Sequence, residues 1–544
     1  MKFGAVFACL LFLSACGESR FSDTLETILP DPSDYVYGAF VADDSRAVVG
    51  ARNVLAKGGS AADAAVALYF TLSVTMPSVA SLGGGGVCLV HDPKTQRTEM
   101  LDFIAPEPKS GVTGGDRPTA VPASVRGMAA LHRRFGRLRW SDTVIHAETL
   151  ARGGFVVSKE TAADLARAAR PLFVDQGARR VFSMADGSPV IEGELIRQVE
   201  LGATLGQIRA RGAGAFYSGP LANRLVEGIR QAGGTITKQD LRSYLPRWRP
   251  ALTVRYGEND LHVAGPPVLS GAVIAQMWQM LLTDQRYEKA PAEERPHLLA
   301  EVARRAFSDR ETWIGINGDR QTQSTRLLSS EHARQLMTSY DADRATPPGA
   351  PQTGGALISE NPSGTGFVVV DGLGLAVACT TTLYNPFGTG RLVPGVGIFM
   401  AQAPGVGSRN PYSLSPAMVT DREGKIFRFA AAGVAGQAVP SVIVGVAART
   451  LLEKQPAKEA VTGPRLHPLP GSDSVIVEAA ETPPRVETLV RRGHAILRQS
   501  SLGRINVIHC STGIPIPSLS KVNCRPVADN RGSGTGLELL IELE

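Results

Sequence analysis

The sequence predicts a large α+β protein, and three patterns carry this prediction. Helical periodicity dominates residues 122–284 and returns at 291–306. Two runs rich in β-branched residues then flank a glycine turn within residues 367–382, which predicts a β-hairpin. Further strand-like segments alternate with helices after the hairpin, at 426–432, 475–477 and 505–508. This mixture is typical of sheets that are covered by helices.

Length and composition exclude several classes of protein. The chain has 544 residues, of which 43% are hydrophobic and 20% charged, so it is too long for one compact core. No long apolar run follows residue 15, which argues against later membrane spans. The net charge is +6, but the basic residues are interleaved with acidic ones and form no aromatic-rich basic stripe. We therefore expect no nucleic-acid partner.

The N-terminus has the pattern of an export signal. Lys2 precedes an apolar stretch at residues 3–13 that is too short to span a bilayer. The stretch ends in Leu13-Ser14-Ala15-Cys16, which resembles the bacterial lipobox. We expect residues 1–15 to be a lipoprotein signal peptide, and Cys16 to carry a lipid that anchors the protein in the bacterial cell envelope, facing the periplasm or the exterior. The alternative is a chance cysteine after an apolar run.

A helix leads into a glycine cluster in the first part of the chain. Ser60 and Asp63 form a capping box for an Ala-rich helix that is expected to reach about Phe70. The four glycines at 83–86 then precede a β-like run at 87–90. Since neither a helix start nor Lys-Ser/Thr follows the glycines, we expect close backbone packing here rather than phosphate binding.

The chain changes character at residues 340–364, which are rich in Pro, Gly, Thr and Ser. A connection of this length is expected either to be functional or to lack fixed structure. It divides the sequence into a longer segment, 16–339, and a shorter one, 365–544.

The cysteines separate into two groups. Cys510 and Cys524 bracket a Pro-rich turn, and we expect them to form a disulfide in an oxidising compartment. Cys88 and Cys379 lie in apolar runs and are expected to be buried core thiols. No cysteine spacing is typical of a metal site, and we expect no metal. We expect no cofactor either.

Several short segments, in chain order, resemble one known family over nearly the whole chain after the signal segment. They are Ala61-Ala62-Asp63-Ala64-Ala65, Val121-Pro122-Ala123-Ser124, Gly153-Gly154-Phe155, Ala215-Phe216-Tyr217-Ser218-Gly219, Phe387-Gly388-Thr389-Gly390 and Ser413-Leu414-Ser415-Pro416. Each motif is weak by itself, but the collinear set is similar to the γ-glutamyltransferases, which resemble N-terminal nucleophile hydrolases.

The resemblance implies a four-layer αββα sandwich made as a precursor that cuts itself in the loop before the hairpin. The large-subunit-like part would be 16–339 and the small-subunit-like part 365–544, each the partner of the other. The new N-terminal Thr then attacks a γ-glutamyl or related acyl amide of a small-molecule substrate, and its own α-amine serves as the base.

The nucleophile position departs from the family pattern. Counting back from Asp371 without a gap places Gly364 where the family has its nucleophilic Thr, and Thr365 where it has a second Thr. Glycine has no hydroxyl, so Thr365 is the candidate nucleophile, with cleavage between Gly364 and Thr365, provided that the backbone slips or kinks there. The alternative is an ordinary Thr at a strand entry. Thr382 matches a family Thr that hydrogen-bonds the nucleophile.

Part of the family's oxyanion-stabilising apparatus is retained in sequence. Ser413 matches one of its paired serines, and Gly433 and Gly436 match a glycine loop whose N–H groups face the developing oxyanion. The alternative is that these turns persist because the fold requires them.

The substrate clamp of the family is missing. Ile104 precedes Ala-Pro where the family has an Arg-Glu pair, Tyr384 replaces a substrate-contacting Asn, and residues 404–407 replace an acidic pair. Since an apolar side chain cannot replace bidentate recognition of a carboxylate by Arg, glutathione is a doubtful substrate.

Three hypotheses follow. The first is an amidohydrolase or acyltransferase with Thr365 as nucleophile, and the second is a catalytically silent lipoprotein of the same fold that binds a ligand or partner. The third, an unrelated exported hydrolase, is disfavoured because G-x-S-x-G and H-E-x-x-H are both absent.

Overall fold

The computed structural model describes residues 35–109, 111, 115–313, 324–347, 364–404, 413–515 and 522–542. The expected signal peptide at 1–15 and the lipidation site Cys16 lie outside this part of the chain. In the part that is described, no helix is long and apolar enough to cross a membrane.

Two antiparallel sheets form the centre of the molecule. The first has the strand order β18 (Thr535–Glu542), β1 (Tyr35–Ala42), β9 (Gly364–Asp371), β10 (Ala376–Thr382), β2 (Gly85–Asp92), β3 (Arg97–Phe103) and β6 (Arg247–Pro250). The second has the order β17 (Cys524–Val527), β16 (Arg504–Ile514), β12 (Phe427–Val434), β11 (Ala417–Asp421), β8 (Asn259–Val263) and β7 (Leu252–Tyr256). The expected hairpin is present as β9 and β10.

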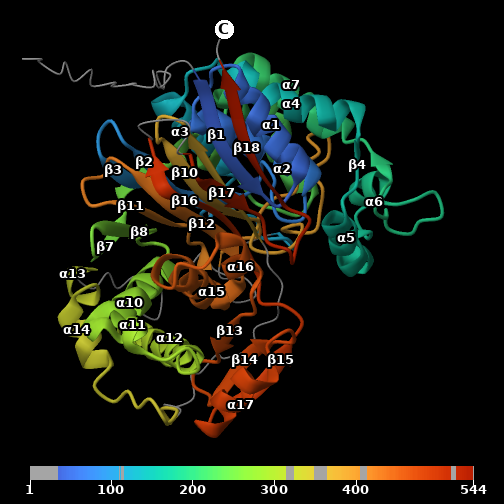
Figure 1. The fold of residues 1–544 in the computed structure, drawn as a ribbon. Coiled ribbons are helices and arrows are strands. Elements are labelled where there is room, and N and C mark those ends of the chain that lie inside the picture. The colour runs from blue at the N-terminus through green and yellow to red at the C-terminus, as the bar shows by residue number, and fades with distance from the viewer. Residues whose placement is uncertain are drawn as a thin grey trace, which may run out of the picture.

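Helices cover the outer face of each sheet, which confirms the predicted αββα arrangement (Figure 1). The helices on the first sheet include α1 (Ser45–Ala56), α2 (Ala61–Thr75), α3 (Ser124–Phe135), α4 (Trp140–Gly153) and α7 (Val199–Arg211). Those on the second include α10 (Ser270–Leu282), α12 (Arg295–Trp313), α15 (Val439–Ala447) and α16 (Ala457–Thr462). Separate apolar clusters fill the two helix–sheet layers and the space between the sheets.

Smaller elements surround these layers. β4 (Phe155–Val156), α5 (Lys159–Leu172), α6 (Gln176–Phe182) and β5 (Leu195–Ile196) project to the right in Figure 1. The remaining elements are α8 (Gly219–Gln231), α9 (Lys238–Ser243), α11 (Arg286–Lys289), α13 (Ser324–Leu327), α14 (Ser330–Leu336), β13 (Leu466–Pro468), β14 (Ser474–Glu478), α17 (Pro483–Arg491) and β15 (Ala495–Gln499).

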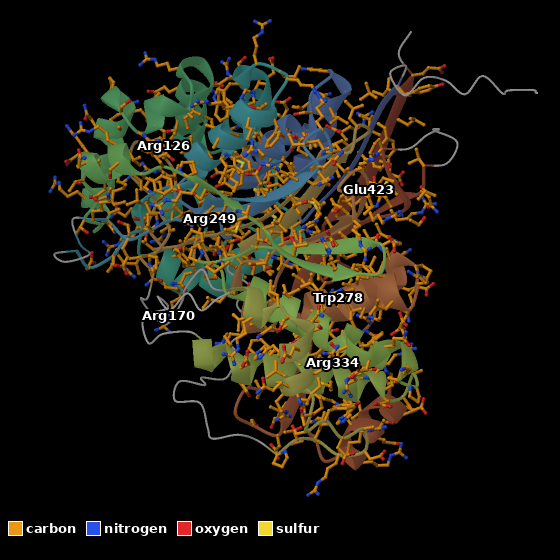
Figure 2. All side chains as sticks on the ribbon, turned by 90° about the vertical axis from the view of Figure 1, so that its left-hand side faces the viewer. Arg126, Arg170, Arg249, Trp278, Arg334 and Glu423 are labelled. Atoms are coloured by element: carbon orange, nitrogen blue, oxygen red, sulfur yellow. A yellow bond between two sulfur atoms is a disulfide. The ribbon has the colours of Figure 1, made fainter. Side chains whose placement is uncertain are left out.

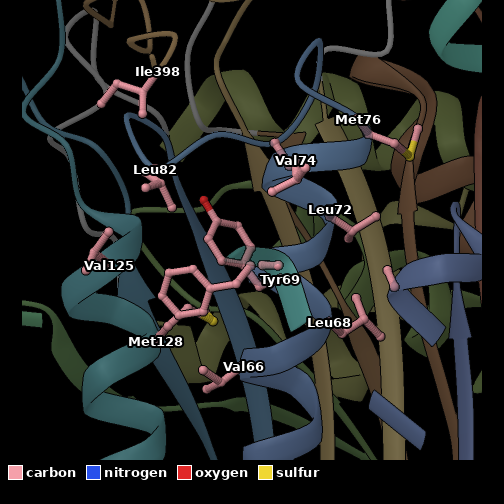
Figure 3. Packing of buried hydrophobic residues seen from close by; sticks show 14 of the residues in the cluster. Val66, Leu68, Tyr69, Leu72, Val74, Met76, Leu82, Val125, Met128 and Ile398 are labelled. Atoms are coloured by element: carbon pink, nitrogen blue, oxygen red, sulfur yellow. The ribbon is translucent and has the colours of Figure 1, made fainter. Parts of the chain in front are cut away.

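The capping box predicted for α2 is present, because the Ser60 side chain accepts from the Asp63 N–H and the Asp63 carboxylate accepts from the Ser60 N–H. The helix continues beyond Phe70 to Thr75. All of its residues are buried, so tertiary packing stabilises the helix along its whole length. Tyr69 lies among the apolar side chains of α2 and α3 in Figure 3, and its hydroxyl donates to the Ser81 carbonyl at 2.6 Å.

The glycine cluster serves close packing, as predicted. A Cβ on Gly86 would lie 2.4 Å from the carbonyl oxygen of Thr380, and one on Gly83 would lie 2.3 Å from that of Phe399. β2 therefore lies against β10 where a side chain would not fit.

The helical layer on the second sheet is anchored by an aromatic pair. Trp278 of α10, labelled in Figure 2, is fully buried and meets Tyr256 of β7 edge-on, with ring centroids 5.3 Å apart. Such pairs add to the stabilisation that comes from the buried apolar area.

The two sequence segments on either side of residues 340–364 are not separate bodies in space. Both central sheets contain strands from both segments: β9 and β10 pair between β1 and β2 in the first sheet, and β11 pairs with β8 in the second. Neither segment can complete a sheet alone.

Two disulfides cross neighbouring strands. The predicted bridge between Cys510 and Cys524 is confirmed, with the Cα atoms 3.9 Å apart on β16 and β17. The prediction for Cys88 and Cys379 was wrong, because these residues are bonded to each other rather than free thiols. Both are fully buried and directly opposite on β2 and β10, a pairing that apolar runs in a sequence do not reveal.

Removing the second bridge is expected to lower stability. The double variant Cys510→Ala/Cys524→Ala frees a loop of about 15 residues, which corresponds to roughly 3 kcal/mol in the chain-entropy account. Urea denaturation of the oxidised proteins measures the difference. Equal midpoints for the variant and the wild type would show that the bridge contributes nothing.

Candidate active site

The start of β9 meets the ends of β10 and β12 at one end of the sandwich. Gly364 is paired with Thr382 at the end of β10. A Cβ on Gly364 would lie 2.5 Å from the carbonyl oxygen of Thr381 and 3.0 Å from Cγ1 of Val434, the last residue of β12. The two sheets therefore approach each other closely at the predicted cleavage position.

Thr365 is fully buried, and its hydroxyl is held by a carboxylate. Oγ1 of Thr365 donates to Oδ2 of Asp43 at 2.8 Å. Nδ2 of Asn506 donates to the other carboxylate oxygen at 2.8 Å, and also to the carbonyl oxygen of Gly366 at 2.8 Å. A hydroxyl, a carboxylate and an orienting amide thus form one chain of hydrogen bonds, the arrangement that activates a nucleophile.

A guanidinium completes this group. Nη2 of Arg504 lies 3.8 Å from Oδ2 of Asp43. Burial lowers the pKa of Arg504, but the carboxylates of Asp43, Asp164 and Glu160 outweigh burial and raise it. Arg504 therefore stays charged beside the Asp43 carboxylate.

Sequence reasoning missed Asp43, Asn506 and Arg504. Asp43 directly follows the apolar strand β1, and Asn506 interrupts the apolar run of β16. A buried polar residue requires a hydrogen-bond partner. A polar residue within or directly after an apolar strand is therefore the sequence signal that could have identified them.

Strand alternation separates Thr365 from its expected partner. Thr365 shares a face of β9 with Phe367, which packs toward the helices, whereas Gly364 shares the other face with Val368 in the inter-sheet core. Thr382 lies opposite Gly364, and its Oγ1 accepts from the N–H of Tyr384 at 2.8 Å. The residue that holds the Thr365 hydroxyl is therefore Asp43, not Thr382.

The glycine loop lies against the start of β9. A Cβ on Gly366 would lie 2.6 Å from the carbonyl oxygen of Ala432 and 2.8 Å from the nitrogen of Gly433. Gly436 follows with a φ of +55°, which favours glycine. Ser413 is partly buried, and no hydrogen bond joins it to Thr365 in the described chain.

Comparison with known proteins decides the family. The sequence model described as Gamma-glutamyltranspeptidase matches residues 47–539. The chain belongs to the γ-glutamyltranspeptidase family. The expected resemblance is therefore confirmed.

Individual relatives agree with this membership. The chain is 29% identical over 456 residues to a glutathione hydrolase proenzyme of Pseudomonas aeruginosa, covering 76% of this chain and 78% of the relative. It is 25% identical over 492 residues to the Escherichia coli glutathione hydrolase proenzyme, covering 83% and 84%. These relatives are hydrolases, in agreement with the prediction of an enzyme. A cephalosporin acylase from Bacillus halodurans, 23% identical, superposes with a TM-score of 0.77 over 93% of this chain and 97% of that chain, which confirms the fold alone.

The residues at the positions expected for a substrate clamp make internal contacts in this chain. Ile104 packs against the apolar core, and the neighbouring Asp102 is paired with Arg249 at 2.9 Å. The Tyr384 hydroxyl donates to the Ala105 carbonyl at 2.9 Å, and its φ of +65° is unusual for a residue other than glycine. Of residues 404–407, only Pro404 is described.

One group of His and Glu side chains in the described chain has the composition of a metal site. It consists of His297 and Glu301 of α12 and of His494, all buried. The two imidazoles share a hydrogen bond of 2.7 Å, and the Glu301 carboxylate already accepts from Arg305 and Thr346. Its charge is thus balanced without an ion.

Adding a side chain at the start of β9 is expected to destabilise the fold. Gly364→Ala places a methyl group 2.5 Å from a backbone oxygen, which should cost about 1–3 kcal/mol as overpacking does elsewhere. Urea denaturation measures the loss. Gly445→Ala in α15 is the matched control, because its methyl group meets no atom within 4 Å and should be neutral or slightly stabilising. If Gly364→Ala leaves the stability unchanged, the start of β9 must be able to move away from its neighbours to make room for the methyl group.

Proposed function

We propose that this protein cleaves or transfers γ-glutamyl or related acyl amides with Thr365 as an N-terminal nucleophile, after self-cleavage between Gly364 and Thr365. The observation that supports the proposal is the hydrogen bond from the Thr365 hydroxyl to Asp43, a carboxylate that Asn506 orients.

Self-cleavage uses the same groups. Oγ1 of Thr365 attacks the carbonyl carbon of Gly364 while Asp43 takes the proton of the hydroxyl. The N–H groups of the loop beginning at Gly433 donate to the oxyanion that develops on the Gly364 carbonyl oxygen. The amide bond between residues 364 and 365 then breaks, its nitrogen gains the proton, and water hydrolyses the resulting ester. The products are a carboxylate on Gly364 and a free amine on Thr365, which serves as base in later turnovers. Relatives named as proenzymes are consistent with such processing.

The substrate class follows from the missing clamp. With Ile104 in place of Arg, a buried α-carboxylate would have no guanidinium partner at that position, and an unpaired buried charge costs several kcal/mol. We propose that acyl amides without the two charges of an α-amino acid are processed at least as well as γ-glutamyl ones.

The decisive experiment is a reducing SDS gel of the purified protein combined with mass spectrometry. Two fragments, the smaller beginning at Thr365, together with release of amine from a neutral acyl amide, are the expected result. An intact chain that releases no amine would refute the proposal.

A second candidate, a catalytically silent binding protein of the same fold, is favoured by one observation. The position at which the resemblance implies the nucleophile holds Gly364, where an added Cβ would lie 2.5 Å from a backbone oxygen. The same gel and assay distinguish the two candidates.

Membrane attachment through Cys16 is part of the proposal and supplies a separate prediction. Cys16→Ala is expected to move the protein from the membrane fraction to the soluble fraction, because lipid on this cysteine is the proposed anchor. Fractionation of cells followed by immunoblotting measures this shift. A Cys16→Ala protein that stays in salt-washed membranes would contradict the anchor.

A further inference from the structure

A cavity of about 520 Å³ lies in the helical layer on the second sheet. Its wall includes Tyr287, Leu299, Val442, Arg449, Pro464 and Arg485. None of the residues around the start of β9 contributes to it, and its volume is that of a small-molecule site.

Arg449 lines this cavity and has no carboxylate partner in the described chain. Its Nε donates to the Gly445 carbonyl at 3.3 Å and its Nη1 to the Pro464 carbonyl at 3.2 Å, and no carboxylate of the described chain lies within ion-pair distance. Burial lowers its pKa to about 10, with Arg465 and Arg485 adding to the effect. Arg449 is half-buried, and a guanidinium that is shielded from water is ordinarily paired with an anion.

Four glutamates line the cavity; Glu293 and Glu459 are exposed, and the other two are engaged elsewhere. Glu453 accepts from the Tyr287 hydroxyl and lies 3.5 Å from Arg295. Glu481 lies 3.5 Å from Arg485 and accepts from the N–H of Thr482. No ion pair joins any of the four to Arg449 in the described chain, which leaves its guanidinium available to an anionic ligand.

The backbone around Arg449 has three unusual features. It lies in a π-helical turn at Ala448–Leu452, a rare conformation that recurs at functional sites. Lys454 follows with a φ of +60°. A Cβ on Gly463 would lie 2.4 Å from Nη1 of Arg449, so the absence of a side chain there leaves room for the guanidinium.

We propose that this cavity binds a small organic anion, whose carboxylate or phosphate group pairs with Arg449. Its apolar body would lie against Leu299 and Val442, which line the same cavity. Arg449 offers the fork geometry that suits both carboxylate and phosphate.

Calorimetric titration of the purified full chain with benzoate and with phenyl phosphate tests the proposal and distinguishes the two anion types. At least one probe should bind saturably, and Arg449→Met should weaken that binding at least tenfold. Arg422→Met, an exposed residue 3.9 Å from Glu258, is the matched control and should bind like the wild type.

Gly445→Leu is a second variant that keeps the charge of Arg449 and fills the cavity, and it too should lose binding. If Arg449→Met fails to fold, this variant decides alone. Failure of both probes to bind the wild type at millimolar concentrations would overturn the proposal, as would equal binding to Arg449→Met or, in its place, to Gly445→Leu.

Discussion

Thr365→Ala is expected to leave the chain uncut and to abolish turnover. The substitution removes the oxygen that attacks both the Gly364 carbonyl and the substrate, and loss of a nucleophile typically costs several orders of magnitude in rate. Reducing gels and an amine-release assay measure the two effects.

Two variants separate chemistry from packing. Thr381→Val alters the buried neighbour directly across from Thr365 and should leave processing intact. Asp43→Asn keeps the shape of the side chain but cannot accept the proton, so it should slow self-cleavage. Cleavage that continues in Thr365→Ala would move the nucleophile to Ser363 or elsewhere.

Asp529→Ala is expected to cause the largest loss of stability. Asp529 and Arg465 form a fully buried ion pair, and Asp529 also accepts from the N–H of Ile505 at 2.8 Å. Removing the carboxylate leaves Arg465 buried and unpaired, which should cost about 3–5 kcal/mol. Urea denaturation at neutral pH measures the difference. The exposed Asp343→Ala should change stability by no more than about 0.5 kcal/mol.

The pH dependence of this effect has a definite sign. Burial raises the pKa of Asp529, but the charges of Arg465 and Arg531 outweigh burial and lower it. Because the folded-state pKa lies below the unfolded one, the stabilisation is present above the unfolded pKa and is lost as pH falls through the folded pKa. The wild type and Asp529→Ala should therefore converge in strong acid. A constant difference across that range would contradict the assignment.

Local patterns in the sequence predicted much of the fold. Alternation and the glycine turn predicted the β9–β10 hairpin, and the side chains of Ser60 and Asp63 predicted where α2 begins. These features depend on residues close together in the chain, where backbone preferences act directly.

The candidate site could be predicted only in part. The family resemblance implied Thr365 as the nucleophile and Thr382 as its partner, whereas the Thr365 hydroxyl donates to Asp43, 322 residues away. Alternation tells which residues share a face of a strand, but not which strands become neighbours. The same limit explains why Cys88 and Cys379, 291 residues apart, were expected to be free thiols.

The Cys88–Cys379 bridge determines what self-cleavage would produce. Cys88 precedes the proposed scissile bond and Cys379 follows it, so a cut chain would remain a covalent heterodimer. Its parts could separate only after reduction, and an unreduced gel would show one band for cut and uncut protein alike. Because the new N-terminus on β9 and Cys379 on β10 belong to one hairpin, the bridge would also tether the freed amine to the longer polypeptide on β2.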